Sequence, residues 1–185
     1  MDKKFFDHVR QHLFGGKLTE TQVSGIQRLV TAANFYGMSD HRQVAYLLAT
    51  VFHETDKKMQ PIEEYASGAA YEGRADLGNT MKGDGVRFKG RGDVQITGRR
   101  NYALFSKMLS IDLVNNPSLA LDPTYSAHIA VIGMMQGRFT GKKLSDYIVC
   151  GQEPDYKNAR RIINGTDKAT LIAGYAKQFS TAFGR

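Results

Sequence analysis

The feature that most constrains the fold is a glycine-rich segment in the middle of the chain. Eight glycines lie between residues 66 and 98 of the 185-residue sequence. Glycine destabilises helices because it loses more backbone freedom on folding than any other residue. We therefore predict loops and short extended pieces over 66–98, in a region of the kind where binding residues tend to collect.

Helical patterns precede this segment. Thr19 and Gln22 have the spacing of a capping box, and Asp40 and Gln43 repeat that spacing. Apolar residues follow each pair at intervals of three and four residues. This pattern predicts two amphipathic helices before the glycine-rich segment.

Helical patterns return after the segment. A short helix is predicted over 101–109, and Asp122-Pro123 predicts the start of another helix that ends at Gly137. A further helix is predicted over 156–163, and a last helix is expected to take Asp167 as its N-cap. We therefore expect a mainly α-helical fold in which 66–98 is the exception.

Length and composition limit the class of protein. A chain of 185 residues is expected to form one domain, residues 1–185. Hydrophobic residues make up 42% and charged residues 23%, which excludes a disordered tail and a coiled coil. The formal net charge of +7 favours polyanionic partners, such as nucleic acid, an anionic membrane or an acidic cell-wall polymer.

Several expected absences also bear on function. The N-terminus shows no apolar core of a signal peptide, and no stretch reaches the ~20 apolar residues of a membrane span. The single cysteine, Cys150, suits a reducing cytoplasm. His8 and His12 could face one metal, but the chain has neither a zinc-protease motif nor a cysteine cluster. We expect no metal site and no cofactor.

The first chemical signal is Glu54, within Phe-His-Glu-Thr at 52–55. On a helix, Glu54 continues the apolar face formed by Leu47 and Val51. A carboxylate at the end of an apolar stripe is poorly solvated, which raises its pKa and suits a general acid. The alternative is an exposed glutamate at a frayed helix end.

The second signal is Glu63-Glu64, which begins nine residues after Glu54. Pro61 ends the helix, so both side chains are expected on a loop that can fold back. Two carboxylates across a cleft can hydrolyse a glycosidic bond, one as the acid and one as the base for water. Acidic loop residues are also commonly solvated surface.

The third signal is an alternating pattern at 94–97. Val94 and Ile96 alternate with Gln95 and Thr97, as on a short half-buried strand. Gln95 and Thr97 would then project from one face and could bind sugar hydroxyls, N-acetyl groups or a positioned water. The surrounding basic residues could instead bind phosphate or form a solvated hairpin.

Four motifs follow one another along the chain, namely Phe-His-Glu-Thr at 52–55, Tyr-Glu-Gly-Arg at 71–74, Gly-Arg-Gly-x-x-Gln-Ile-Thr-Gly-x-x-Asn-Tyr at 90–102 and Ile-Ile-Asn-Gly at 162–165. This order resembles the family-19 glycoside hydrolases, the family of plant chitinases and their bacterial relatives. The sequence is most similar to the compact endolysins of bacteriophages that infect Gram-negative bacteria. The resemblance implies a lysozyme-like domain with two lobes.

The resemblance also implies roles for individual residues. Glu54 matches the general acid of the family, Glu63 the carboxylate that activates water, and Thr97 a residue that helps to hold this water. Glu64 and Glu72 remain alternatives to Glu63, although Glu72 is expected to pair with Arg74. The residues implied to bind substrate are His53, Tyr71, Arg74, Gln95, Asn101 and Asn164.

The sequence departs from plant chitinases in ways that favour a different substrate. It has no tryptophan and no long chitinase loops, and Arg100 stands where the plant enzymes carry an aromatic residue. We therefore expect a monomeric endolysin that cleaves β-1,4 bonds of peptidoglycan, whose stem peptides are acidic. The alternatives are a chitinase, a basic nucleic-acid-binding module and a non-catalytic wall-binding domain.

The expected setting follows from the same resemblance. Without a signal peptide, an endolysin would collect in the host cytoplasm and reach the cell wall after the inner membrane is opened. Residues 138–185 hold nine Lys and Arg against four Asp and Glu. The last helix could therefore contact an anionic outer membrane, or it could be an ordinary packed helix.

Overall fold

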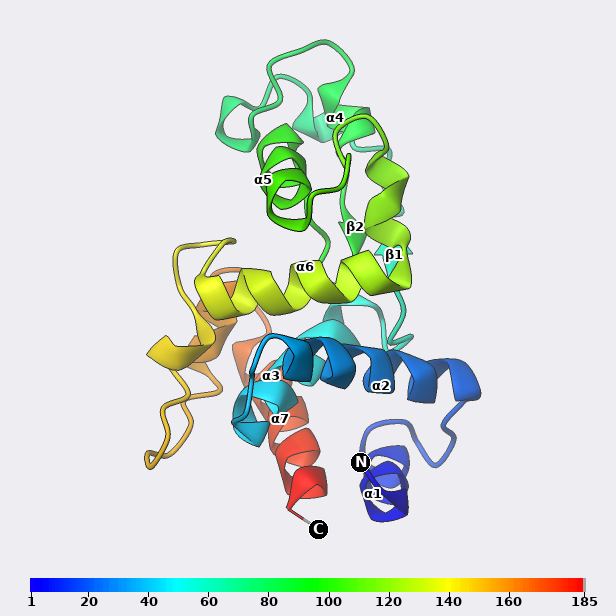
Figure 1. The fold of residues 1–185 in the computed structure, drawn as a ribbon, viewed down its shortest axis with the longest axis vertical. Coiled ribbons are helices and arrows are strands. Elements are labelled where there is room, and N and C mark those ends of the chain that lie inside the picture. Colours follow the sequence, from blue (N-terminus) through cyan, green and yellow to red (C-terminus); the bar gives the residue numbers. More distant parts are fainter. Residues whose placement is uncertain (185) are drawn as a thin grey trace.

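The computed structural model describes residues 1–184, and it is mainly helical (Figure 1). The α-helices are α1 (Lys3–His12), α2 (Glu20–Phe35), α3 (His41–Glu54), α4 (Asp84–Arg87), α5 (Arg99–Leu109), α6 (Pro123–Gln136) and α7 (Ala169–Phe183). Two short strands are β1 (Ile62–Glu63) and β2 (Arg91–Gly92). The 3₁₀ helices are η1 (Ala69–Tyr71), η2 (Ala75–Leu77), η3 (Pro117–Leu121), η4 (Leu144–Asp146) and η5 (Asn158–Ile162).

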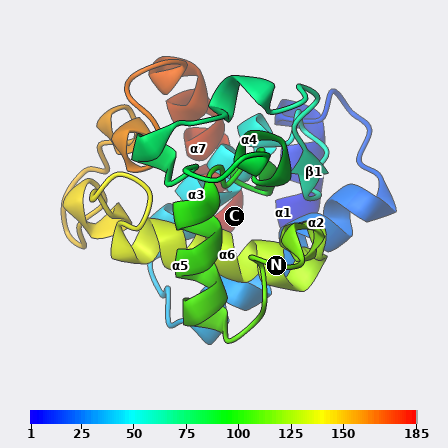
Figure 2. The ribbon, with the colours of Figure 1, turned by 90° about the horizontal axis from the view of Figure 1, so that it is seen from above.

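The elements form two lobes, as the resemblance implied. Figure 1 shows α6 across the middle, with α4 and α5 on one side and α1, α2, α3 and α7 on the other. Seen from above in Figure 2, the 66–98 segment and α5 lie over the larger helical lobe. The glycine-rich segment therefore contributes most of the smaller lobe.

The larger lobe is organised around α3. Every residue from Val44 to Phe52 is buried, and α3 makes its most extensive contacts with α7. From α7, the side chains of Ile172 and Phe179 are fully buried against this core. Burying a large aliphatic or aromatic side chain contributes about 1.5–3 kcal/mol, so the α3–α7 contact is a major source of stability.

Most of the predicted helix ends are confirmed. Thr19 and Gln22 form both hydrogen bonds of a capping box at the start of α2. Asp122 caps α6, and Gly137 ends α6 in the left-handed conformation. Asp40 also caps α3, but the predicted box with Gln43 is wrong: the Gln43 side chain donates to the Ile148 carbonyl, 2.9 Å away, and so ties α3 to a distant loop.

Two predictions near the C-terminus are wrong. The helix expected over 156–163 is only η5, since its backbone hydrogen bonds join residues three apart, from the Arg160 N–H to the Lys157 carbonyl and from the Ile163 N–H to the Arg160 carbonyl. Asp167 does not cap α7. Lys168 precedes the helix with a φ of 57°, and no side chain caps it.

The strand expected at 94–97 is also wrong. The chain turns between Arg91 and Ile96, which bond to each other through both backbone groups, and Gln95 lies in the turn with a φ of 54°. The strand that does form, β2, pairs antiparallel with β1 and sets Glu63 opposite Arg91. A tight turn therefore replaces the half-buried strand.

Glycine allows close packing in the smaller lobe. A Cβ on Gly85 would lie 2.6 Å from the Glu72 backbone nitrogen, closer than packed atoms approach. Arg99 clamps the same region from α5 through two hydrogen bonds to Asp84, a buried carboxylate. These hydrogen bonds from Arg99 outweigh desolvation and lower the pKa of Asp84.

An ion pair joins the two lobes. Arg28 of α2 donates to both carboxylate oxygens of Asp93, at 2.6 and 2.9 Å, and the Asp93 side chain is completely buried. Arg28 also donates to the Pro123 carbonyl at 2.7 Å, and the Asp93 backbone N–H donates to the hydroxyl of Ser126 at 2.7 Å. Helices α2 and α6 and the turn after β2 therefore meet at this pair.

The last helix is an integral part of the core. Its apolar face is covered by α3, while Leu171 and Lys177 are exposed. The proposed contact of this helix with an outer membrane stays a prediction. The monomeric state of the protein and its accumulation in the host cytoplasm also stay predictions. Within residues 1–184, the structure contains no helix with both the length and the apolar character of a membrane span.

We expect Arg28→Met to destabilise the protein by about 3–5 kcal/mol, because it leaves the buried Asp93 carboxylate without its counter-charge. The free energy of unfolding would be measured in urea by circular dichroism. Arg10→Met is the matched control. Arg10 pairs with Asp7 on the exposed surface of α1, so its loss should cost less than about 1 kcal/mol. Equal effects from the two variants would contradict the prediction.

Candidate active site

A pocket of about 270 Å³ lies between the lobes. The smaller lobe and the turn after β2 supply one wall, and the larger lobe supplies the other. The structure thus brings five of the predicted site residues together in this pocket. Its lining residues are Glu54, Leu77, Val94, Gln95, Ile96, Thr97, Asn101, Phe139, Ile163 and Asn164.

Glu54 is the last residue of α3, and its side chain is 18% exposed. Arg160 donates to it through Nη1 at 2.6 Å and is itself only 4% exposed. The Nε of Arg160 donates to the Asp167 carbonyl at 3.0 Å, which fixes the guanidinium from behind. The sequence had suggested an apolar setting for this carboxylate, whereas the structure supplies an ion-pair partner.

Arg160, the ion-pair partner of Glu54, is a residue that the sequence analysis missed. It lies four residues before Asn164, in the run that carries the Ile-Ile-Asn-Gly motif. Its neighbour Arg161 is exposed. Arg160 and Arg161 are adjacent, and no spacing pattern in the sequence distinguishes one from the other. Only the tertiary structure shows that Arg160 is the one that reaches Glu54.

The opposite wall is a small hydrogen-bonded unit. Gln95 donates through Nε2 to the carbonyls of Ile62 and Gly92, at 2.7 and 2.9 Å. The Thr97 hydroxyl donates to the Gln95 carbonyl at 3.1 Å, and Asn101 donates to the Thr97 carbonyl at 2.8 Å. These bonds use the donors that face the protein. The Thr97 hydroxyl oxygen can still accept a hydrogen bond within the pocket.

The rest of the lining is apolar and was not anticipated. Leu77 comes from η2, Phe139 follows α6, and Ile163 follows η5. Phe139 packs so closely on α6 that a Cβ at Gly133 would lie 2.1 Å from its ring. Mixed apolar and amide surfaces of this kind suit a sugar with both ring faces and hydroxyl edges.

Glu63 lies outside this lining, on strand β1, which pairs with β2. Arg91 donates to it through Nε at 2.7 Å, and the Lys89 ammonium lies 3.2 Å from its other oxygen. Partial burial raises the pKa of this carboxyl, but the hydrogen bonds from Lys89 and Arg91 outweigh burial and hold its pKa below the ordinary value. Glu63 is therefore an ionised carboxylate at neutral pH.

The two alternatives to Glu63 are engaged elsewhere. Glu64 accepts hydrogen bonds from the Tyr71 hydroxyl at 2.8 Å and from the Gly90 backbone at 3.0 Å, and the contact with Glu64 raises the pKa of Tyr71. Glu72 accepts from the backbone N–H groups of Gly83 and Gly85, at 2.6 and 2.8 Å.

The ion pair predicted between Glu72 and Arg74 is wrong. Arg74 is exposed and pairs with Asp76, two residues along the chain. Asp76 lies in η2, the 3₁₀ helix that begins directly after Arg74, and is therefore within reach of the Arg74 guanidinium. Glu72 is not available to Arg74, because its carboxylate faces the backbone of 83–85. His53 precedes Glu54 in the sequence and is half-buried, but it does not line the pocket.

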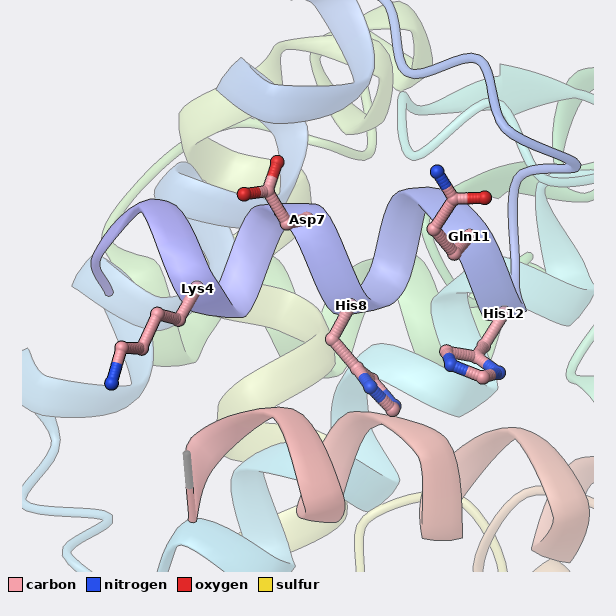
Figure 3. A pocket seen from close by; sticks show the side chains of 5 residues that line it. All are labelled: Lys4, Asp7, His8, Gln11 and His12. Atoms are coloured by element: carbon pink, nitrogen blue, oxygen red, sulfur yellow. The ribbon is translucent and has the colours of Figure 1, made fainter.

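A larger pocket, of about 490 Å³, lies away from these residues on the surface of α1 (Figure 3). His8 and His12 point from α1 toward α7, and their rings stack at 4.2 Å. His8 is within 3.0 Å of the Gln178 side-chain oxygen. Across residues 1–184 no three His, Cys, Asp or Glu side chains gather closely enough to hold a metal ion. Of the catalytic candidates, Glu54 and Thr97 therefore belong to the smaller pocket between the lobes.

Comparisons with known proteins point to one family. The family model of class I chitinases, glycoside hydrolase family 19, matches residues 27–167. Chitinase 11 from Oryza sativa subsp. japonica is 32% identical over 117 residues, which cover 52% of this chain and 46% of that protein. A glycosyl hydrolase family 19 domain-containing protein from Haemophilus influenzae is 41% identical over 59 residues, which cover 32% of this chain and 30% of that protein. The chain spans less than half the length of these relatives.

Solved structures share the fold. Chitinase C from Streptomyces griseus matches with a TM-score of 0.63 and 17% identity, over 99% of this chain and 76% of that one. The class IV chitinase from Zea mays matches with a TM-score of 0.65 and 17% identity, over 100% of this chain and 92% of that one. These likenesses confirm the two-lobed, lysozyme-like fold.

We expect Arg160→Met to destabilise the protein by about 3 kcal/mol, because it leaves Glu54 unpaired and frees the Asp167 carbonyl. Arg160→Lys should recover part of this loss, since it keeps the charge but not the planar fork. Arg161→Met is the control: it removes an exposed cation next in sequence and should change stability by less than about 0.5 kcal/mol. Urea unfolding would measure all three variants. A loss at Arg161 as large as that at Arg160 would show that Glu54 does not depend on this contact.

Proposed function

Because this chain belongs to glycoside hydrolase family 19, we propose that it hydrolyses β-1,4 glycosidic bonds, with Glu54 as the general acid and Glu63 as the general base. One observation carries the proposal. The pocket between the lobes holds Glu54 together with Thr97 and the amide side chains of Gln95 and Asn101. An ionised carboxylate, Glu63, lies on β1, and the turn after its partner strand β2 forms part of this wall.

The proposed reaction uses these groups in turn. Protonated Glu54 donates its proton to the glycosidic oxygen, and the C–O bond breaks as positive charge develops at the anomeric carbon. Glu63 takes a proton from water, which attacks that carbon from the opposite face and inverts its configuration. Arg160 stabilises the Glu54 carboxylate that remains after the proton has left.

Thr97 is assigned to the water. Its hydroxyl hydrogen is used in the bond to the Gln95 carbonyl, so its oxygen is free to accept a hydrogen bond from the attacking water. Asn101 and Asn164 line the pocket from opposite lobes and are assigned to sugar hydroxyl or N-acetyl groups. No metal or cofactor takes part in this scheme.

For the substrate, we propose the glycan strands of peptidoglycan. Arg100, Arg138 and Arg161 are exposed, and each lies within two residues of a side chain that lines the pocket. Exposed cations this close in sequence to the lining residues would attract a polymer that carries acidic stem peptides more than they attract neutral chitin. The net charge of +7 acts in the same direction. On this basis the protein would be an endolysin. A chitinase with the same catalytic residues is the second candidate, which the plant relatives favour.

We expect Glu54→Gln to lower the rate of glycan hydrolysis by roughly 10²–10⁴-fold, because general acid catalysis contributes about that much. Glutamine retains an acceptor oxygen for Arg160, so the fold and substrate binding should persist. Glu72→Gln is the control, since Glu72 binds backbone groups of the smaller lobe and should keep most activity. Near-normal turnover by Glu54→Gln would remove this residue from the assigned role.

Substrate preference can be measured directly. We expect faster release of reducing ends from purified peptidoglycan than from chitin oligomers, and a fall in that preference as salt is raised, because screening weakens attraction to acidic stem peptides. Mass spectrometry of the products would identify the new reducing-end sugar, and proton NMR during the reaction would show whether the first anomer formed is inverted. A preference for chitin oligomers, unaffected by salt, would favour the chitinase function instead.

A further inference from the structure

The carboxylate of Glu63 is held by two cations, one at each oxygen. Arg91 lies opposite Glu63 in the β1–β2 register and donates through Nε to Oε1 at 2.7 Å. The Lys89 ammonium lies 3.2 Å from Oε2. Both cations are largely shielded from solvent, since the Arg91 side chain is 11% exposed and that of Lys89 is 17% exposed. The Glu63 side chain is itself 42% exposed, so solvent weakens these salt bridges in part, while the shielded cations keep their positions.

A buried tyrosine stands behind these cations. Arg91 donates through Nη1 to the Tyr102 hydroxyl at 3.0 Å and to the Arg87 carbonyl at 2.8 Å. The Tyr102 hydroxyl donates in turn to the Lys89 carbonyl at 2.8 Å. One hydroxyl therefore orients the guanidinium of one cation and the backbone of the other.

Tyr102 is itself rigidly placed. It is completely buried at the start of α5, and its ring packs against Phe88 at 5.2 Å. Burial raises the pKa of Tyr102 to about 12, more than the hydrogen bond and charge of Arg91 lower it. The hydroxyl therefore stays protonated and can donate to the Lys89 carbonyl throughout the working pH range.

The neighbouring charged and titratable groups leave this arrangement intact. Glu64 faces the Tyr71 hydroxyl and the Gly90 backbone rather than Glu63. Lys89 also contacts the Glu64 carbonyl at 3.3 Å, which anchors the ammonium between the two glutamates. The groups around the Glu63 carboxylate are thus two cations and the tyrosine that orients them.

We propose that Arg91 and Tyr102 are positioning residues that act through Glu63, fixing the direction of its carboxylate and preserving its charge at acid pH. The proposal rests on the role of Glu63 as the base in the proposed function. Neither Arg91 nor Tyr102 lines the pocket between the lobes. Arg91 acts directly on the carboxylate, and Tyr102 acts one bond further away.

The sign of the pH effect follows from the role of a base. Glu63 works only when ionised, so activity falls as the pH drops through the pKa of this group. The cations lower that pKa, which keeps the enzyme active further into the acid range. Removing or misplacing a cation should therefore move the acid limb of kcat/KM to higher pH.

The test compares pH profiles of Tyr102→Phe, Arg91→Met and Arg91→Lys. Tyr102→Phe keeps the packed ring but loses the hydroxyl that orients Arg91, so we expect the acid limb to move to higher pH by less than in Arg91→Met. For Arg91→Met we expect a rise of about 1–2 units, since an opposite charge in contact lowers a carboxyl pKa by that amount. Arg91→Lys keeps a positive charge and should therefore shift the acid limb less than Arg91→Met does. In all three variants kcat should fall more than KM rises.

Arg87→Met is the matched control. Its guanidinium belongs to the same segment but donates to the carbonyls of Val114 and Asn115, not to Glu63. Removing it subtracts a nearby positive charge without touching the carboxylate, so the acid limb should stay in place. If Arg87→Met moved the acid limb as far as Arg91→Met does, the proposal would be overturned. The loss of any nearby positive charge would then explain the change in the pKa of Glu63, without a specific contact.

A measurement independent of turnover completes the test. Carbon NMR would follow the titration of the Glu63 carboxyl, with its resonance identified by comparison with Glu63→Gln, and the pKa should rise in Tyr102→Phe and Arg91→Met. Suppose that Glu63→Gln is inactive, but that Tyr102→Phe and Arg91→Met fold and change neither the acid limb of kcat/KM nor the pKa of Glu63. Only the positioning roles of Arg91 and Tyr102 then fail. If Glu63→Gln is fully active, the assigned base is wrong and the proposed function fails with it.

Discussion

The buried ion pair between Arg28 and Asp93 is the interaction on which the rest of the structure depends. It joins α2 of the larger lobe to the turn that forms one wall of the pocket, and its hydrogen bond to the Pro123 carbonyl adds the start of α6. The Asp93 side chain is completely buried, so it must keep its partner. This requirement sets how the two lobes meet, and the pocket lies where they meet.

Within that frame, opposite walls of the site are built by different means. On the larger lobe, Glu54 ends a buried helix and is held by Arg160, which is fixed in turn by a backbone carbonyl. On the smaller lobe, a tight turn is closed by hydrogen bonds from Gln95 and Thr97 to the backbone. These hydrogen bonds hold the Glu54 carboxylate and the Thr97 hydroxyl in fixed positions on the two walls of the pocket.

Prediction from sequence succeeded where the signal was local. The capping box at Thr19 and the Asp122-Pro123 start of α6 depend on residues within one helical turn, and both are observed. It failed where a side chain has a distant partner. Gln43 binds a loop carbonyl about a hundred residues away, and Glu72 binds the backbone at 83 and 85 instead of the nearby Arg74. Spacing in the sequence cannot reveal such partners, because they depend on how the chain folds back.

The sequence by itself determined that this chain is mainly helical, that a glycine-rich segment interrupts the helices, and that its motifs resemble those of family-19 glycoside hydrolases. These properties follow from short-range preferences and residue order. Only the tertiary structure decided that Arg160 rather than Arg161 meets Glu54, and that Arg91 and Lys89 hold Glu63. The physical reason is that an ion pair requires two charges to approach within a few ångströms, and residues far apart in the chain reach that distance only when the chain has folded back on itself.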